Sequence, residues 1–92
     1  MITLQIKTPK ELGMAIAANL RARRRERKLS MRELGLKAGV SYGSLKRFES
    51  TGEISLKSLL KLAVVMDCAD QFEALFAKKR INSIQEIIDG TV

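Results

Sequence analysis

The 92-residue chain contains no histidine, and its only cysteine is Cys68. Histidine is the commonest general base and metal ligand, so its absence argues against most acid–base and metal chemistry. The sequence also has no cluster of metal ligands and no paired carboxylates that would share a cleft. We therefore expect a protein that is not an enzyme, with no catalytic residues, no metal site and no cofactor.

Disulfides and long apolar runs are missing as well. A lone cysteine cannot form an internal disulfide, which agrees with a reducing compartment, and the apolar residues before Cys68 predict a small buried side chain. The longest uncharged apolar stretches, residues 14–18 and 62–66, are far too short to span a bilayer or to form a signal-peptide core. We expect a cytoplasmic protein without a membrane segment.

Proline and aromatic residues are scarce. The one proline is Pro9, and only four side chains are aromatic although 46% of the residues are apolar. The core should therefore consist of Leu, Ile, Ala and Val, which favours a helical bundle. No repeat or low-complexity run marks a linker, so we expect one small domain with no separate sensor domain.

Basic residues are abundant and unevenly distributed. The formal net charge is +7, and residues 1–50 hold twelve Lys or Arg against four Asp or Glu. Residues 51–92 hold five basic residues against six acidic ones. This asymmetry predicts one end that faces a polyanion and a second end with a different role.

Residues 30–52 predict two helices joined by a tight turn. Apolar residues four apart in the first helix and three apart in the second mark the inward faces. Gly39 can take the left-handed conformation that ends the first helix, and Ser41 can cap the second. Gly52 should end the second helix. The inward residues are Leu34 and Ala38, then Leu45 and Phe48. Because so few residues separate the helices, they should cross sharply, as in a helix-turn-helix.

The outer face of the second helix carries Tyr42, Gly43, Lys46 and Arg47. A helix inserted in a major groove needs groups of this kind, since arginine pairs with guanine and glycine allows close backbone approach. The same pattern also fits an ordinary amphipathic helix with a solvated polar face. This helix alone does not decide between the two interpretations.

The first helix is predicted from Pro9 to about Lys28. Thr8 and Glu11 form a capping box around Pro9, and Leu12, Ile16 and Leu20 follow as the expected buried stripe. Six cations occupy the eight positions from 21 to 28. Basic residues are favourable near a helix C-terminus because of the helix dipole, but six are more than this effect requires. We expect some of them to contact nucleic-acid phosphates, the candidates being Arg21, Arg23, Arg25, Arg27 and Lys28.

The remaining segments complete an all-helical prediction with boundaries at residues 1–8, 9–77 and 78–92. Ser30 with Glu33, and Ser55, are expected helix caps, and the helix after Ser55 is apolar nearly all round, as a central core helix would be. Asp70 with Glu73 should open a short fifth helix. The expected inward residues of that helix are Phe72, Leu75 and Phe76.

The two ends of the chain carry patterns of their own. Residues 1–7 alternate like a strand that could pair with a second chain, although a disordered terminus fits equally. Ser83 with Glu86 should cap a last helical turn that ends at Gly90. Its isoleucines, Ile84, Ile87 and Ile88, exceed the need of one small core, so part of them could form a subunit interface.

The span from Leu12 to Phe76 resembles the lambda-repressor-like, Cro and Xre family of five-helix DNA-binding domains. The resemblance covers about two-thirds of the chain. It rests on Ser30, Glu33-Leu34, Gly39-Val40-Ser41, Leu45, Glu49 and the Ser55-Leu56-x-x-Leu59 start of the fourth helix. It implies an all-α helix-turn-helix domain that binds double-stranded DNA and regulates transcription. The strand-like arm before this domain and the helical extension after it come from the residue patterns described above.

The resemblance also assigns roles to residues. Arg24 and Glu49 occupy the positions of a structural ion pair. Met31 stands where many members have a phosphate-touching glutamine, so we expect that contact to be lost, with Arg32 as a candidate substitute. Gly35 replaces the usual alanine and should allow closer helix packing. The expected base-reading residues are Tyr42, Gly43 and Arg47, and the expected backbone contacts are Ser41, Ser44, Lys46, Arg32, Arg25 and Lys28.

Residues 39–63 also resemble the small Xre-type antitoxins encoded beside HipA-type kinase toxins, which bind their own promoter as dimers. The resemblance implies a dimeric repressor with a kinase toxin as a possible partner. Two alternatives remain open from the sequence. One is a phage-type repressor without a toxin, and the other is a protein-binding adaptor that keeps the fold.

Overall fold

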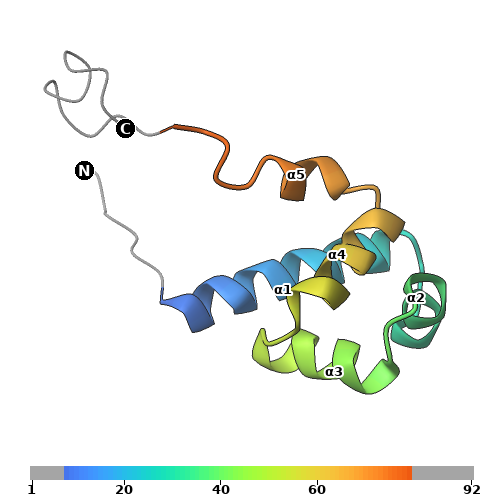
Figure 1. Ribbon diagram of the computed structural model, residues 1–92. Helices are drawn as coiled ribbons and strands as arrows, with labels where there is room; N and C mark the ends of the chain where they lie inside the picture. Colours follow the sequence, from blue (N-terminus) through green and yellow to red (C-terminus); the bar gives the residue numbers. More distant parts are fainter. Residues whose placement is uncertain (1–7, 80–92) are drawn as a thin grey trace, which may run out of the picture.

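The computed structural model describes residues 8–79, which form five helices and no strand. The helices are α1 (Pro9–Glu26), α2 (Met31–Ala38), α3 (Tyr42–Thr51), α4 (Leu56–Val65) and α5 (Ala69–Glu73). Figure 1 shows α3 along one edge of the molecule and α5 at the opposite edge. The predicted N-terminal arm and C-terminal helix lie outside the described residues. None of the helices in residues 8–79 has the length and apolar character needed to span a bilayer.

Local signals in the sequence placed the helix boundaries well. Thr8 and Ser30 both form complete capping boxes with the glutamate three residues later, as predicted. Ser41 and Ser55 cap α3 and α4, also as predicted. In the Ser30 box, bonds from the Ser30 main-chain N–H and side chain lower the pKa of the Glu33 carboxyl. Each cap satisfies main-chain N–H groups that a helix start leaves free.

Two glycines end the helices of the motif. Gly39 has φ 71° after α2, and Gly52 has φ 79° after α3. Both angles lie in the left-handed region, where a side chain would be strained. The predicted turn and the predicted end of α3 are therefore confirmed.

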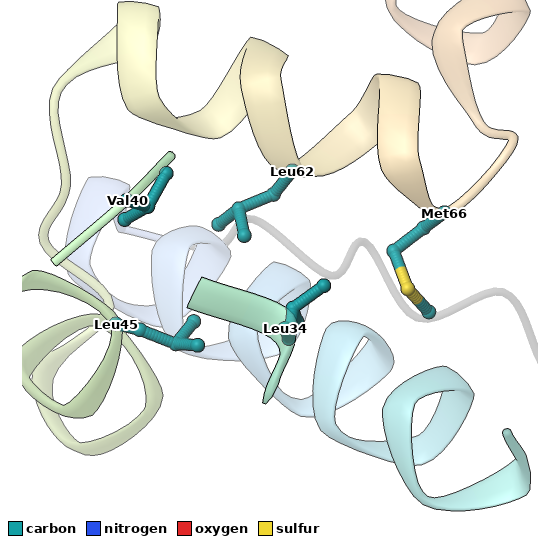
Figure 2. Close-up of a cluster of buried hydrophobic side chains, with 5 residues drawn as sticks. All are labelled: Leu34, Val40, Leu45, Leu62 and Met66. Carbon is teal, nitrogen blue, oxygen red and sulfur yellow. The ribbon is translucent and has the colours of Figure 1, made fainter. Parts of the chain in front are cut away.

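Figure 2 shows the core cluster, in which side chains from α2, α3 and α4 meet. Leu34, Leu45 and Leu62 are fully buried, and Val40 from the turn and Met66 after α4 complete the cluster. The predicted inward residues Leu34, Leu45 and Phe48 are thus confirmed. Aliphatic side chains from three helices hold α2 and α3 at a fixed angle, which positions the outer face of α3.

The predicted buried stripe of α1 is partly wrong. Leu12 is 52% exposed, and the fully buried apolar residue of α1 is Ala17. Gly13 contacts the main chain of Gly52 at the end of α3, and Ala17, four residues later, lies on the same side of α1. Ile16 and Leu20 are half-buried and line a groove of about 450 Å³ toward α4 and α5.

The two last described helices are less buried than predicted. In α4 the buried residues are Leu62 and Ala63, whereas Leu56, Leu60 and Val64 are exposed, so α4 is not buried all round. The fifth helix starts without a side-chain cap and already ends at Glu73. Two predicted inward residues, Leu75 and Phe76, lie beyond that end and are exposed, and Phe72 is half-buried. Cys68 is half-buried beside the core, not fully buried.

Candidate nucleic-acid interface

Close backbone contact places α3 against α2. A Cβ at Gly35 would lie 2.6 Å from the carbonyl oxygen of Val40, much closer than real Cβ atoms approach. The Gly35 carbonyl also accepts a 2.9 Å hydrogen bond from the Val40 N–H. Glycine at position 35 therefore permits the closer packing that the sequence predicted, and it lets α2 approach the turn that leads into α3.

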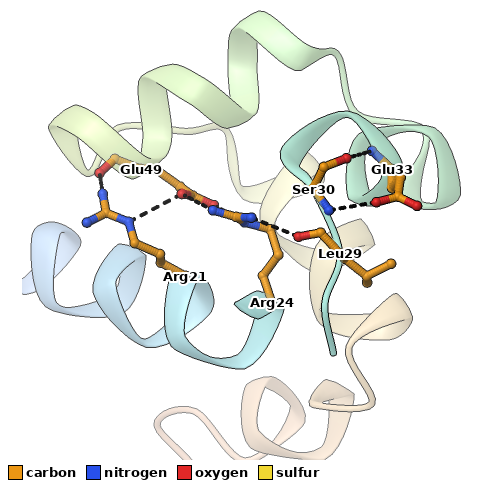
Figure 3. A network of polar contacts seen from close by, with 6 residues as sticks. All are labelled: Arg21, Arg24, Leu29, Ser30, Glu33 and Glu49. Carbon is orange, nitrogen blue, oxygen red and sulfur yellow. Dashed lines mark hydrogen bonds and ion pairs between the residues drawn. The ribbon is translucent and has the colours of Figure 1, made fainter. Parts of the chain in front are cut away.

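A buried ion pair fixes the other end of α3 to α1. The Nε of Arg24 donates to Oε2 of Glu49 at 2.9 Å, and its Nη2 donates to Oε1 at 3.0 Å (Figure 3). A third donor of Arg24, Nη1, binds the Leu29 carbonyl at 2.8 Å. Both charged groups are buried, and they are the two residues that the family resemblance pairs. The bidentate geometry locks the relative position of α1 and α3.

Arg21 adds a second cation to the same carboxylate. Its Nη2 donates to the main-chain carbonyl of Glu49 at 2.7 Å, and its Nε reaches Oε1 at 3.4 Å. Arg21 was one of the candidate phosphate contacts predicted from the sequence, and nothing in its local pattern indicated that it binds Glu49. Its spacing of three residues from Arg24 puts both on one side of α1, which is the only sequence signal for it.

With its inner face held, α3 presents its outer face to solvent. Gly43, Lys46 and Arg47 are exposed, and Tyr42 at the first position is half-buried. A Cβ added at Gly43 would meet no atom within 4 Å, so protein packing does not require glycine there. The predicted base-reading residues therefore share one accessible face of the helix, with a gap at Gly43.

Three of the side chains on this face have intramolecular partners. The Nη2 of Arg47 donates to Oε1 of Glu53 at 2.7 Å, with both side chains about two-thirds exposed. The guanidinium carbon of Arg32 lies 4.0 Å from the centre of the Tyr42 ring, and Nζ of Lys46 lies 6.0 Å from it. The sequence reasoning missed Glu53, since its distance from Arg47 in the chain fits no helical spacing.

The N-cap of α3 also brings together two predicted backbone contacts. The Ser41 hydroxyl accepts a 3.1 Å bond from the Ser44 N–H and donates at 2.9 Å to the Ser44 hydroxyl. In this arrangement the Ser44 hydroxyl hydrogen is the one left to donate outward. Both serines are exposed at the start of α3.

Most of the basic run at the end of α1 serves the fold. Besides Arg21 and Arg24, Arg23 pairs with Glu26 at 2.7 Å. Arg27 donates to the carbonyls of residues 65 and 66 and to the Asp67 carboxylate, so it satisfies the C-terminal end of α4. Arg25 and Lys28 are exposed, and neither side chain has a hydrogen bond or ion pair within residues 8–79. They are the cations of the run whose side chains have no partner within these residues.

Groups that could hold a metal do not gather anywhere in the part of the chain that the structure describes. The site therefore offers hydrogen-bond donors, positive charge and one aromatic ring. These groups match a polyanion with hydrogen-bonding edges rather than a small reacting substrate.

Comparison with known families agrees with this geometry. A family model described as helix-turn-helix matches residues 20–71, more than half of the chain. The matched span contains the end of α1, all of α2, α3 and α4, and the start of α5. Neither a curated protein nor a solved structure matches the chain.

Proposed function

The chain belongs to the helix-turn-helix family and is a DNA-binding regulator, and we propose that it is a sequence-specific repressor that binds an inverted-repeat operator as a homodimer. The observation that supports this most is the two-sided character of α3. Leu45, Phe48 and Glu49 are buried on one side, while the other side carries accessible donors. A recognition helix needs this combination of rigid support and a free polar face.

In this proposal the exposed face of α3 reads base edges in the major groove. Arg47 pairs with a guanine, exchanging or sharing its bond to Glu53, and the Tyr42 hydroxyl bonds to a base near the helix N-terminus. Gly43 lets the helix backbone approach the bases closely, since no side chain occupies that space. A good bidentate base contact contributes about 1–3 kcal/mol of discrimination.

Phosphate contacts would surround this face. Lys46 and Arg32 flank Tyr42, and Ser44 has a hydroxyl hydrogen free to donate. The side chains of Arg25 and Lys28, at the end of α1, have no partner within residues 8–79 and are proposed as further contacts. Ser41 would act through the bond that orients Ser44 rather than by donating itself.

A dimer is the second part of the proposal. Two recognition helices in successive major grooves lie about 34 Å apart, so the operator would be an inverted repeat. We place the second copy against exposed apolar side chains on and after α4, which would be removed from water in a dimer. They are Leu56, Leu60, Val64, Leu75 and Phe76.

The most specific part of the proposal is an antitoxin role. Its support is the resemblance of residues 39–63 to antitoxins that accompany HipA-type kinase toxins. A stable complex between this chain and the kinase encoded beside it, if one is encoded there, would support the role. A phage-type repressor would show operator binding without such a complex. An adaptor protein would bind a protein partner and show no preference among DNA sequences.

Selection from a pool of randomised duplexes tests the repressor proposal. Enrichment of one inverted repeat, with half-sites separated by one helical turn, is the expected result. A pool that stays random after repeated rounds contradicts sequence-specific binding. Sedimentation of the protein alone and with the selected duplex gives the number of subunits in each state.

A further inference from the structure

Tyr42 connects the two helices of the motif through its ring. Tyr42 is the first residue of α3, and the guanidinium of Arg32 from the first turn of α2 lies 4.0 Å from the ring centre. At this distance the positive charge is attracted by the electron-rich ring face. Arg32 is exposed, and no hydrogen bond or ion pair engages it within residues 8–79.

A guanidinium that lies over a ring keeps its hydrogen-bonding capacity. Arginine carries several N–H donors, and contact with one ring leaves most of them free. The contact also restricts a long side chain that would otherwise lose rotational freedom on binding. The Tyr42 ring therefore holds the donors of Arg32 ready at the protein surface.

The packing at Gly35 supports this arrangement. Gly35 lies on the same helix as Arg32, and the space where its Cβ would be is 4.0 Å from the Tyr42 N and 2.6 Å from the Val40 carbonyl oxygen. A larger residue would push α2 away from the start of α3. The close approach at Gly35 thus keeps Arg32 within reach of the ring.

We propose that Arg32 and Tyr42 form one phosphate-binding unit, in which the ring of Tyr42 positions Arg32 and only the hydroxyl of Tyr42 reads a base. The proposal rests on the DNA binding proposed above. The first helix of a helix-turn-helix crosses the DNA backbone, which places Arg32 near a phosphate. The first residues of the recognition helix face base edges, which places the Tyr42 hydroxyl at a base.

Substitutions separate the ring from the hydroxyl. Tyr42→Phe keeps the ring, whereas Tyr42→Leu removes it. Binding to a random duplex reports the phosphate contact, because such contacts are independent of sequence. Arg32→Ala should weaken that binding about tenfold and lower the salt slope by about one. Tyr42→Leu should reproduce most of this loss, and Tyr42→Phe should leave random-duplex binding unchanged while reducing operator preference.

The double variant gives the decisive comparison. If the two residues act as a unit, Arg32→Ala with Tyr42→Leu should bind a random duplex within about twofold of Arg32→Ala alone. Arg25→Ala is the matched control, since Arg25 is an exposed arginine proposed above as a phosphate contact, and it has no ring contact within residues 8–79. The fold-loss in random-duplex binding of Arg25→Ala should multiply with that of Tyr42→Leu. Thermal unfolding of each variant checks that the fold is retained.

The outcomes test the phosphate-binding unit separately from the sequence-specific repressor on which it rests. Losses of Arg32→Ala and Tyr42→Leu that multiply on random DNA would overturn the phosphate-binding unit, even where the wild-type protein prefers its operator. Coupled losses on random DNA, without any operator preference, would support the positioning of Arg32 by the ring and contradict both base reading by the Tyr42 hydroxyl and the sequence-specific repressor. An equal loss of random-duplex binding by Tyr42→Phe would also overturn the unit, because that variant retains the ring.

Discussion

Gly13 of α1 and Gly52 at the end of α3 lie in direct main-chain contact. A Cβ at Gly13 would be 2.6 Å from the Gly52 carbonyl oxygen, and a Cβ at Gly52 would be 2.6 Å from the Met14 N. This contact and the Arg24–Glu49 ion pair both join α1 to α3. The recognition helix is therefore held at its C-terminal end by two different kinds of interaction.

Gly13→Ala should destabilise the fold. The new methyl group would meet main-chain atoms that cannot rotate away, an overpacking cost of about 1–3 kcal/mol. Alanine's better helix propensity would offset at most about 1 kcal/mol of it. Urea unfolding followed by circular dichroism measures the net change. Unchanged or increased stability would contradict the close contact.

Gly43→Ala is the matched control, and it should have opposite effects on stability and binding. The added methyl group meets nothing within 4 Å, so the helix should gain up to about 1 kcal/mol. Operator binding should weaken, because the methyl group would lie between the helix backbone and the bases. A variant that is more stable and binds the operator as tightly as the wild type would remove Gly43 from the site.

Glu49→Ala should cause the largest loss of stability among the polar substitutions. It leaves Arg24 buried without its carboxylate, at a cost of about 3–5 kcal/mol. Glu53→Gln gives the comparison, because the Arg47–Glu53 pair is exposed and its loss should change stability by less than about 1 kcal/mol. Denaturant midpoints of the two variants, measured side by side, check the difference. Similar midpoints would mean that the buried Arg24–Glu49 pair stabilises the fold no more than the exposed Arg47–Glu53 pair does.

Arg47→Ala should reduce operator binding while leaving random-duplex binding nearly intact. The expected loss of discrimination is about 1–3 kcal/mol, the value of one good base contact. Competition between operator and random DNA for the variant measures it. An equal loss on both duplexes would make Arg47 a phosphate contact. Lys46→Ala, for comparison, should weaken both and lower the salt dependence.

Features encoded by a few neighbouring residues were predictable from the sequence. The caps at Thr8 and Ser30, the left-handed turn at Gly39 and the inward face of α3 all depend on local geometry. The exposed polar face of α3 followed from the same periodicity. The Arg24–Glu49 positions came from the family resemblance, since no local pattern pairs residues twenty-five apart.

Features set by helix–helix contact were not predictable. The 3.6-residue repeat marks Leu12 as readily as Gly13, and only the approach of the end of α3 brings the small residue rather than Leu12 into contact. The fifth helix ends at Glu73, and the chain after it turns, with Phe76 at φ 62°. Leu75 and Phe76 therefore do not continue the inward face of the helix. A run of arginines likewise does not show which members find internal partners. Arg27 does so through carbonyls about forty residues away in the chain.

The central claim is that α3 reads DNA sequence, and one titration tests it most directly. The purified protein would be titrated against the duplex from upstream of its own coding sequence and against a scrambled duplex, at two salt concentrations. We predict a preference for the native duplex that persists at the higher salt. Equal binding to both duplexes that disappears with salt would contradict the account, because it would reduce the basic half of the chain to a non-specific electrostatic surface.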